Sequence, residues 1–156
     1  MTNGIPDLLK GLPKETVDET LALGSTIFLN GGDELFALGA EADCLYLVAR
    51  GRINLTLPMQ VRGNEQDVLV EERVPGQTVG WSALTPPYRF TLRATAPLAT
   101  QVISLSREVL CDHFRKHPDI GYTVTLNLAG VIGQRLQLFQ AMWLREMERM
   151  VELRCA

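Results

Sequence analysis

The stretch that decides the fold consists of two segments, Asn30-Gly31-Gly32-Asp33-Glu34-Leu35-Phe36 and Leu45-Tyr46-Leu47-Val48-Ala49-Arg50-Gly51-Arg52-Ile53-Asn54-Leu55. Both contain short apolar runs next to turn signals, which is typical of β-strands. Gly32 and Gly51 stand at tight connections that favour a positive φ, a conformation that glycine adopts without steric cost. Residues of the run Leu45–Val48 alternate between the two faces of the expected sheet. The stretch therefore predicts a series of short strands.

The same pattern continues outward from Gly24 to Ser106. Turn signals such as Arg62-Gly63-Asn64 and Pro86-Pro87 separate the apolar runs. We expect eight strands, at Thr26–Leu29, Glu34–Ala37, Leu45–Ala49, Arg52–Leu57, Asp67–Val74, Gln77–Val79, Thr91–Ala96 and Thr100–Ser104. Short strands at regular intervals predict a sandwich or barrel, and this number matches a jelly roll.

Helical spacing flanks the strands on both sides. The segment Ile5–Leu23 predicts two short helices. After Ser106 the period is helical again, with a break at His117-Pro118, because a residue before proline avoids the α region. We therefore expect a single domain over residues 1–156, with helical parts at 1–23 and 107–156 around a β-roll at 24–106. Its fold class is α+β and mainly β: an eight-stranded jelly roll with short N-terminal helices and a long C-terminal helix.

An apolar stripe runs along the last helix, which we expect to begin near Asp119. Its members are spaced alternately three and four residues apart, with Glu146 as an interruption, and are Ile132, Leu136, Phe139, Trp143, Met150 and Leu153. Such a stripe suits either a partner helix in a dimer or the chain's own roll. The length of the helix favours a homodimer.

Charge and composition exclude several classes of protein. With a formal net charge of −3, the chain has no overall attraction to nucleic acid. The N-terminus has no basic segment followed by an apolar one, and no later run suits a membrane span. Cys44, Cys111 and Cys155 match neither a disulfide framework nor a metal motif. We expect a cytoplasmic protein with reduced thiols and no membrane contact.

The quoted stretch resembles the opening of cyclic-nucleotide-binding domains of the catabolite-activator type. A second stretch resembles the phosphate-binding cassette of the same family, Pro75-Gly76-Gln77-Thr78-Val79-Gly80-Trp81-Ser82-Ala83-Leu84 followed by Pro86-Pro87-Tyr88-Arg89-Phe90-Thr91. In that family, backbone N–H groups and an arginine hold the cyclic phosphate, and a carboxylate after the glycine holds the ribose. The resemblance implies a ligand site at Gly80, Trp81, Ser82, Ala83, Arg89, Phe90, Thr91 and Arg93.

The cassette departs from the family pattern at two positions. Trp81 stands where the ribose carboxylate is expected, and an indole accepts no hydrogen bond from a hydroxyl. Phe90 stands where the phosphate arginine is expected. Arg89 and Arg93 are the two candidates for the missing positive charge, and the alternative is that both are solvated surface residues. Trp81 and Phe90 could likewise contact a ligand or only pack.

Catalysis and DNA binding are not expected. Transcription factors of this type carry a helix-turn-helix after the long helix, and the residues after Trp143 leave no room for one. His113 and His117 are the only histidines, and none falls in an expected strand. They stand four apart on one helix face, where a solvated surface is the expectation and a metal clamp the alternative. We expect no enzyme, no metal site and no cofactor.

Two hypotheses about function stay open at this point. In the first, the chain is a stand-alone sensor that binds a cyclic nucleotide, cAMP or cGMP, or another small anionic ligand at the modified cassette. In the second, it is a degenerate, dimeric scaffold or interaction module that binds no nucleotide. An open cavity at the cassette would favour the first, and aromatic rings filling it would favour the second.

Overall fold

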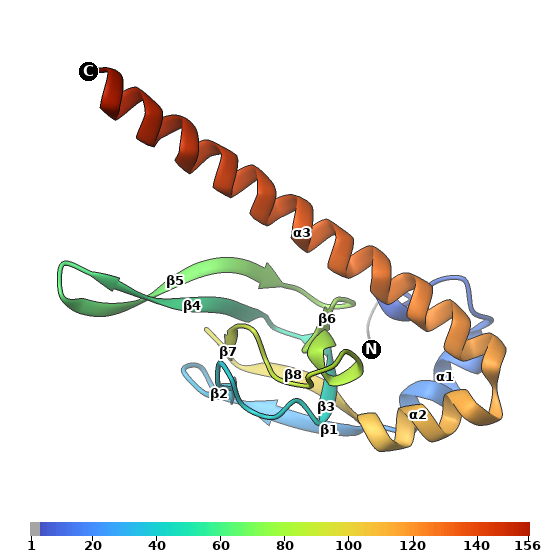
Figure 1. Ribbon diagram of the computed structural model, residues 1–156. Coiled ribbons are helices and arrows are strands. Elements are labelled where there is room, and N and C mark those ends of the chain that lie inside the picture. The colour runs from blue at the N-terminus through green and yellow to red at the C-terminus, as the bar shows by residue number, and fades with distance from the viewer. Residues whose placement is uncertain (1–3) are drawn as a thin grey trace.

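A computed structural model describes residues 4–156 of the chain. Two short helical segments precede a roll of eight strands, and two helices follow it (Figure 1). The bounds are η1 Asp7–Leu9, α1 Lys14–Ala22, β1 Ser25–Leu29, β2 Glu34–Phe36, β3 Cys44–Arg50, β4 Ile53–Val61, β5 Asn64–Arg73, β6 Thr78–Val79, η2 Trp81–Leu84, β7 Arg93–Thr95, β8 Thr100–Ser106, α2 Arg107–Lys116 and α3 Pro118–Cys155. The predicted jelly roll with its flanking helices is confirmed.

The strands form two four-stranded antiparallel sheets, in the orders β1-β8-β3-β6 and β2-β7-β4-β5. Most strands that follow one another in the sequence, such as β2 and β3, lie in different sheets, whereas β4 and β5 pair within one sheet. Gly51 makes the tight connection between β3 and β4 with φ 82°, and a Cβ there would lie 2.6 Å from the Ala99 carbonyl oxygen. The positive φ predicted for Gly32 and Gly51 is confirmed.

The core extends over both faces of β3. Leu45, Tyr46, Leu47 and Val48 are all buried, although alternate residues of a strand face opposite sides. Leu45 and Leu47 face the helical side, where they line an apolar gap together with Leu8 of η1. Tyr46 faces the interior of the roll. Strand β3 is therefore covered by helices on one side and by the second sheet on the other.

The β4–β5 hairpin is longer than the expected strands Arg52–Leu57 and Asp67–Val74. Its ladder continues through Pro58, which pairs with Asp67, to the turn at Arg62 and Gly63. Strand β7 pairs only with residues 54–56 of β4, so β4 has a neighbour on one side at Pro58. A strand tolerates proline at such a position because the missing N–H breaks no second ladder.

Helix α3 has two different halves. Its first half packs on the roll through Ile120, Val124, Leu128 and Val131, all of which are buried. Among the described residues after Arg135 none is buried, and α3 runs diagonally away from β5 to the C-terminus (Figure 1). In the predicted stripe, only Ile132 packs against the core, whereas Leu136, Trp143, Met150 and Leu153 are exposed. Packing on the chain's own roll thus accounts for one end of the stripe only.

Two further features of the structure are the state of the cysteines and the apolar length of the helices. The three cysteines, all within the part of the chain that the structure describes, form no disulfide. No helix within residues 4–156 has an apolar stretch of the length that crossing a bilayer requires.

Candidate ligand site in the β-roll

The cassette begins at Gly80, which has φ 79° and precedes the short helix η2. A left-handed backbone favours glycine, and here the close packing disfavours a side chain as well. A Cβ on Gly80 would lie 3.0 Å from Cε1 of Phe90. Ser82 and Ala83, the next residues inside η2, are buried. The cassette thus contains a left-handed glycine followed by a short, largely buried helix.

The cavity at the cassette is almost completely filled. It is lined by Phe36, Leu55, Gly80, Trp81, Ser82, Phe90, Thr91, Leu92 and Arg135. Its volume is about 10 Å³, which is roughly the space that one water molecule needs. Sites for small organic ligands measure about 300 Å³ or more. In the conformation described, the roll has no room for a nucleotide.

Phe90 is the residue that fills this space. Its ring lies parallel to the ring of Phe36, with centroids 3.6 Å apart and planes 10° apart, and the centroid of the Tyr46 ring lies 5.9 Å from that of Phe36. Phe90 is 4% exposed, so it belongs to the core. Trp81 is half-buried, and its Nε1 has no hydrogen-bond partner among the described residues.

Arg89 and Arg93 lie on the outside of the roll. Nη1 of Arg89 donates to the Gly39 carbonyl at 3.1 Å. Arg93 donates from Nε to Glu34 and from Nη1 to Asp67, each at 2.5 Å. The hydrogen bond to Glu34, with the charge of Asp67, raises the pKa of the Arg93 guanidinium above its ordinary value. Neither arginine lines the cassette cavity, and Ala83 does not line it either. Ligand binding by the predicted residues stays a prediction.

Arg135 lies at the site although no sequence motif pointed to it. This residue of α3 lines the cassette cavity, and its guanidinium carbon lies 5.8 Å from the centre of the Trp81 ring. Its side chain is 9% exposed and donates to one oxygen of Glu71 from Nε at 3.2 Å and from Nη2 at 2.9 Å. The other oxygen of Glu71 pairs with Arg73 at 2.8 Å. No periodicity or spacing marks residue 135, because it is far from the cassette in sequence.

One carboxylate therefore pairs with two largely buried guanidinium groups. Burial lowers the pKa of Arg135 from its ordinary value; the Glu71 carboxylate opposes this shift and the charge of Arg73 adds to it. The cluster of Arg73, Glu71 and Arg135 carries one positive charge in excess. Through Arg135 this charge lies next to the cassette cavity.

The two histidines lie near each other on the helical side. The rings of His113 and His117 have centroids 4.9 Å apart. Across residues 4–156, no group of three or more side chains of the types that bind metals comes together. The pair therefore has no third ligand within the part of the chain that is described.

Comparison with known proteins places the chain in a family. Residues 26–117 match the model of the cyclic nucleotide-binding domain family. This match covers more than half of the chain, so the chain belongs to the cyclic nucleotide-binding domain family. Domains of this family are regulatory and generally non-catalytic. No curated protein sequence matches the chain.

Solved structures of transcription regulators share the fold. The catabolite activator protein of Thermus thermophilus is 27% identical with a TM-score of 0.70, over 94% of this chain and 62% of that one. The N-terminal domain of a transcriptional regulator from Streptomyces coelicolor is 23% identical with a TM-score of 0.70, over 82% of this chain and 89% of that one. The c-di-GMP-responsive regulator CLP of Xanthomonas campestris is 16% identical with a TM-score of 0.75, over 85% of this chain and 64% of that one.

Proposed function

We propose that this chain is a regulatory domain that does not bind a cyclic nucleotide in its roll and that acts as a dimeric interaction module. The observation that carries the proposal is the stack of Phe90 on Phe36 inside a cavity of about 10 Å³. A nucleotide could enter only after this part of the core had opened. Opening it costs the free energy of burying both rings, which the ligand would have to supply.

The chemistry of the cassette supports the same proposal. Trp81 provides no acceptor for a ribose hydroxyl, and Phe90 provides no charge for a phosphate. Arg89 and Arg93 have partners on the outer surface, so recruiting either would break the contacts that hold it. The cassette thus lacks the open space for a nucleotide, the carboxylate for its ribose and the arginine for its phosphate at the positions where the family uses them.

We assign dimerisation to the second half of α3. Leu136, Trp143, Met150 and Leu153 are exposed on a helix of 38 residues, which is roughly 57 Å long. An exposed apolar stripe on a helix that leaves its own domain marks an interaction surface. A second copy of the same helix suits this stripe because both would contribute the same apolar residues.

The unpaired cysteines favour a cytoplasmic location.

A sensor of a small anion is the second candidate function, and one observation favours it. Arg135 lines the cassette cavity and belongs to the cluster with excess positive charge, and the Trp81 indole nitrogen beside it lacks a partner. An anion could use both groups if the Phe90 ring moved away from Phe36. This candidate requires binding by the wild-type chain that is lost in Arg135→Gln and kept in Arg145→Gln, which changes an exposed arginine of the same helix.

The proposal is tested by rebuilding the family pattern. We expect wild-type protein to show no thermal shift with cAMP or cGMP, since a ligand that binds only the folded state must stabilise it. The double variant Trp81→Glu, Phe90→Arg restores both missing groups and removes the filling ring, so it should gain a shift. The variant Phe28→Arg, at a 76% exposed position, is the control for added charge. A shift with wild-type protein would overturn the proposal.

A further inference from the structure

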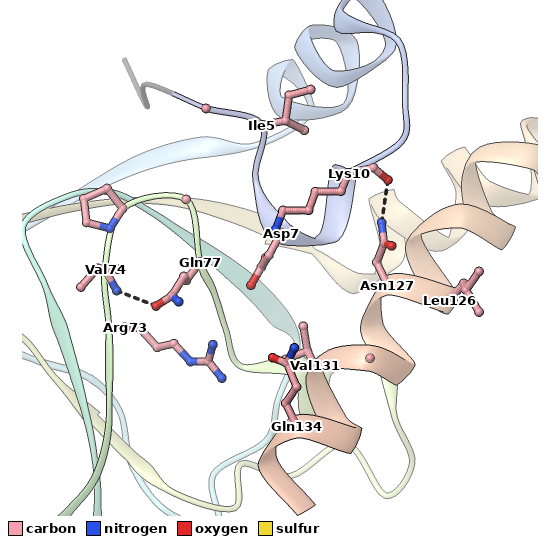
Figure 2. A pocket seen from close by; sticks show the side chains of 14 residues that line it. Ile5, Asp7, Lys10, Arg73, Val74, Gln77, Leu126, Asn127, Val131 and Gln134 are labelled. Atoms are coloured by element: carbon pink, nitrogen blue, oxygen red, sulfur yellow. Dashed lines mark hydrogen bonds between the residues drawn. The ribbon is translucent and has the colours of Figure 1, made fainter. Parts of the chain in front are cut away.

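A second and much larger cleft lies on the other side of the arginine cluster. Its volume is about 700 Å³, within the range of sites for small organic molecules. Three segments form its walls: residues 4–10 at the N-terminus, the turn at residues 74–77, and residues 126–134 of α3 (Figure 2). We call it the Arg73 cleft.

The walls of the Arg73 cleft are held in place by hydrogen bonds between the three segments. The backbone N–H of Asp7 donates to the Gly76 carbonyl at 2.9 Å, and the Asp7 carboxylate accepts from the N–H and hydroxyl of Thr78. Nδ2 of Asn127 donates to the carbonyls of Leu8 and Lys10, both at 2.9 Å. The cleft is therefore formed before any ligand arrives, which lowers the entropic cost of binding.

Arg73 gives the cleft its electrostatic character. Figure 2 shows the Arg73 side chain extending from β5 toward Gln134 of α3. The side chain is 7% exposed, and its Nε is buried without a hydrogen-bond partner in the described part of the chain. Glu71, its ion-pair partner, is shared with Arg135. A buried charge that is only half neutralised favours a nearby anion.

The remaining lining agrees with an anionic ligand that has an apolar part. Lys10 adds a second positive charge, and Asp7, the one acid among the described lining residues, already accepts hydrogen bonds from Leu8 and Thr78. Apolar surface comes from Ile5, Val74, Pro75, Leu126 and Val131.

We propose that the Arg73 cleft binds a small organic anion whose carboxylate or phosphate pairs with Arg73 and whose apolar part lies against Leu126 and Val131. Such a ligand would contact the N-terminal segment, the turn before β6 and α3 together. It would therefore fix α3 against the roll and bias the surface that α3 presents. The site is separate from the cassette and does not depend on the function proposed for it.

The test is an amide NMR titration of the whole chain with three probes that share one ring. Phenyl phosphate and benzoate carry the two candidate anionic groups, and benzamide is the neutral counterpart. We expect at least one of the two anions to shift the amide signals of Gly76, Gln77 and Gly130 saturably. The anion that binds more tightly shows whether the cleft prefers a phosphate or a carboxylate. Benzamide should bind at least about tenfold more weakly, because hydrogen bonds to charged groups are the stronger ones.

Two glycines of α3 provide a matched pair of variants. A Cβ on Gly130 or on Gly133 meets no atom within 4 Å, so both positions accept a side chain, but only Gly130 lines the cleft. Gly130→Leu should abolish the anion-dependent shifts, and Gly133→Leu should preserve them. Arg73→Gln should also abolish the anion-dependent shifts, provided that circular dichroism shows the variant to be folded. If Arg73→Gln does not fold, the comparison of Gly130→Leu with Gly133→Leu tests the proposal.

The proposal is overturned if neither anion gives saturable shifts at millimolar concentration, if benzamide binds as well as the anions, or if Gly130→Leu binds like wild type. A result that contradicts the proposal about the cassette can be distinguished from these outcomes. Cyclic nucleotide in the roll would shift the amide signals of Ser82 and Ala83 and would be insensitive to Gly130→Leu.

Discussion

The rings of Phe36 and Phe90 lie parallel, with centroids 3.6 Å apart, at the point where the family pattern expects an arginine for the cyclic phosphate. Phe36 ends β2 and Phe90 precedes β7, and these two strands pair in one sheet. The aromatic stack thus joins the cassette to the apolar core of the roll. The position that holds a ligand-binding arginine in the family thus holds a residue of the apolar core in this chain.

Phe90→Ala should therefore destabilise the fold strongly. Removing a buried phenyl ring loses its transfer free energy and leaves a cavity, which together cost about 3–5 kcal/mol. Urea unfolding followed by circular dichroism measures the difference. Phe28→Ala, at a position that is 76% exposed, should change stability by less than about 0.5 kcal/mol. Equal losses for the two variants would contradict a core role for Phe90.

Substitutions in the arginine cluster should have unequal effects. Glu71→Gln leaves two buried guanidinium groups without a counter-charge and should cost about 3 kcal/mol. Arg135→Met removes the excess charge and keeps the pair of Arg73 with Glu71, so it should cost clearly less. Chemical denaturation of both variants measures the difference. A larger loss of stability for Arg135→Met than for Glu71→Gln would show that the excess positive charge of the cluster is already compensated.

An exposed ion pair provides the control for the cluster. Arg52 and Glu72 lie 3.3 Å apart with side chains that are 44% and 43% exposed. Exposed pairs of this kind contribute about 0–1 kcal/mol, so Glu72→Gln should be close to neutral. A loss as large as that of Glu71→Gln would mean that general surface charge, not burial, sets the energies.

Trp143→Asp should dissociate the dimer that we propose. Trp143 is 63% exposed in the single chain, and a charge in the middle of an apolar helix interface is costly because it loses its hydration. Light scattering coupled to gel filtration should give the mass of a dimer for wild type and of a monomer for the variant. Arg145→Asp, two residues along the same helix, should leave the dimer intact. A monomeric wild type would remove the dimer from the account.

Stability should decrease at high pH because of Tyr46. Burial raises the pKa of Tyr46 to about 12, with the charges of Cys44 and Asp43 acting in the same direction. The unfolded value is about 10, so the neutral phenol stabilises the fold fully below pH 10. This stability is lost as the pH rises through the folded pKa, by about 3 kcal/mol in total. Urea unfolding at several pH values measures the slope.

Two phenylalanine variants separate Tyr46 from the other tyrosines. Tyr46→Phe should remove most of the decrease between pH 10 and 12, since the variant has no phenol to ionise at this site. Tyr122→Phe, at a 70% exposed position, should retain it. An unchanged slope in Tyr46→Phe would assign the decrease to other groups.

The strands could be predicted because local turn chemistry separates them. Glycines at the connections require a positive φ, and Gly51 has one for the steric reason given above. The expected strands Arg52–Leu57 and Asp67–Val74 leave out the end of β4 and the start of β5, a part of the hairpin that includes Pro58. Only the pairing of strands shows that Pro58 has a free side. A proline's effect thus depends on neighbours that the local sequence does not reveal.

The candidate site was predictable only in part. Gly80, Trp81, Ser82, Phe90 and Thr91, which the family resemblance named, line one cavity, and their binding of a ligand stays a prediction. The arginines nearest in sequence, Arg89 and Arg93, point elsewhere, and the arginine that lines the cavity comes from a helix that begins after the roll ends. Such a contact depends on how α3 packs against β5, which no local pattern contains.

The central claim is that the aromatic core of the roll excludes cyclic nucleotides. It is tested most directly by isothermal titration of wild-type protein with cAMP and cGMP at millimolar concentrations. The account predicts no saturable heat with either nucleotide, and binding of at least one by Trp81→Glu, Phe90→Arg. Saturable micromolar binding by wild type would contradict the account and would mean that the stack of Phe90 on Phe36 opens to form a site.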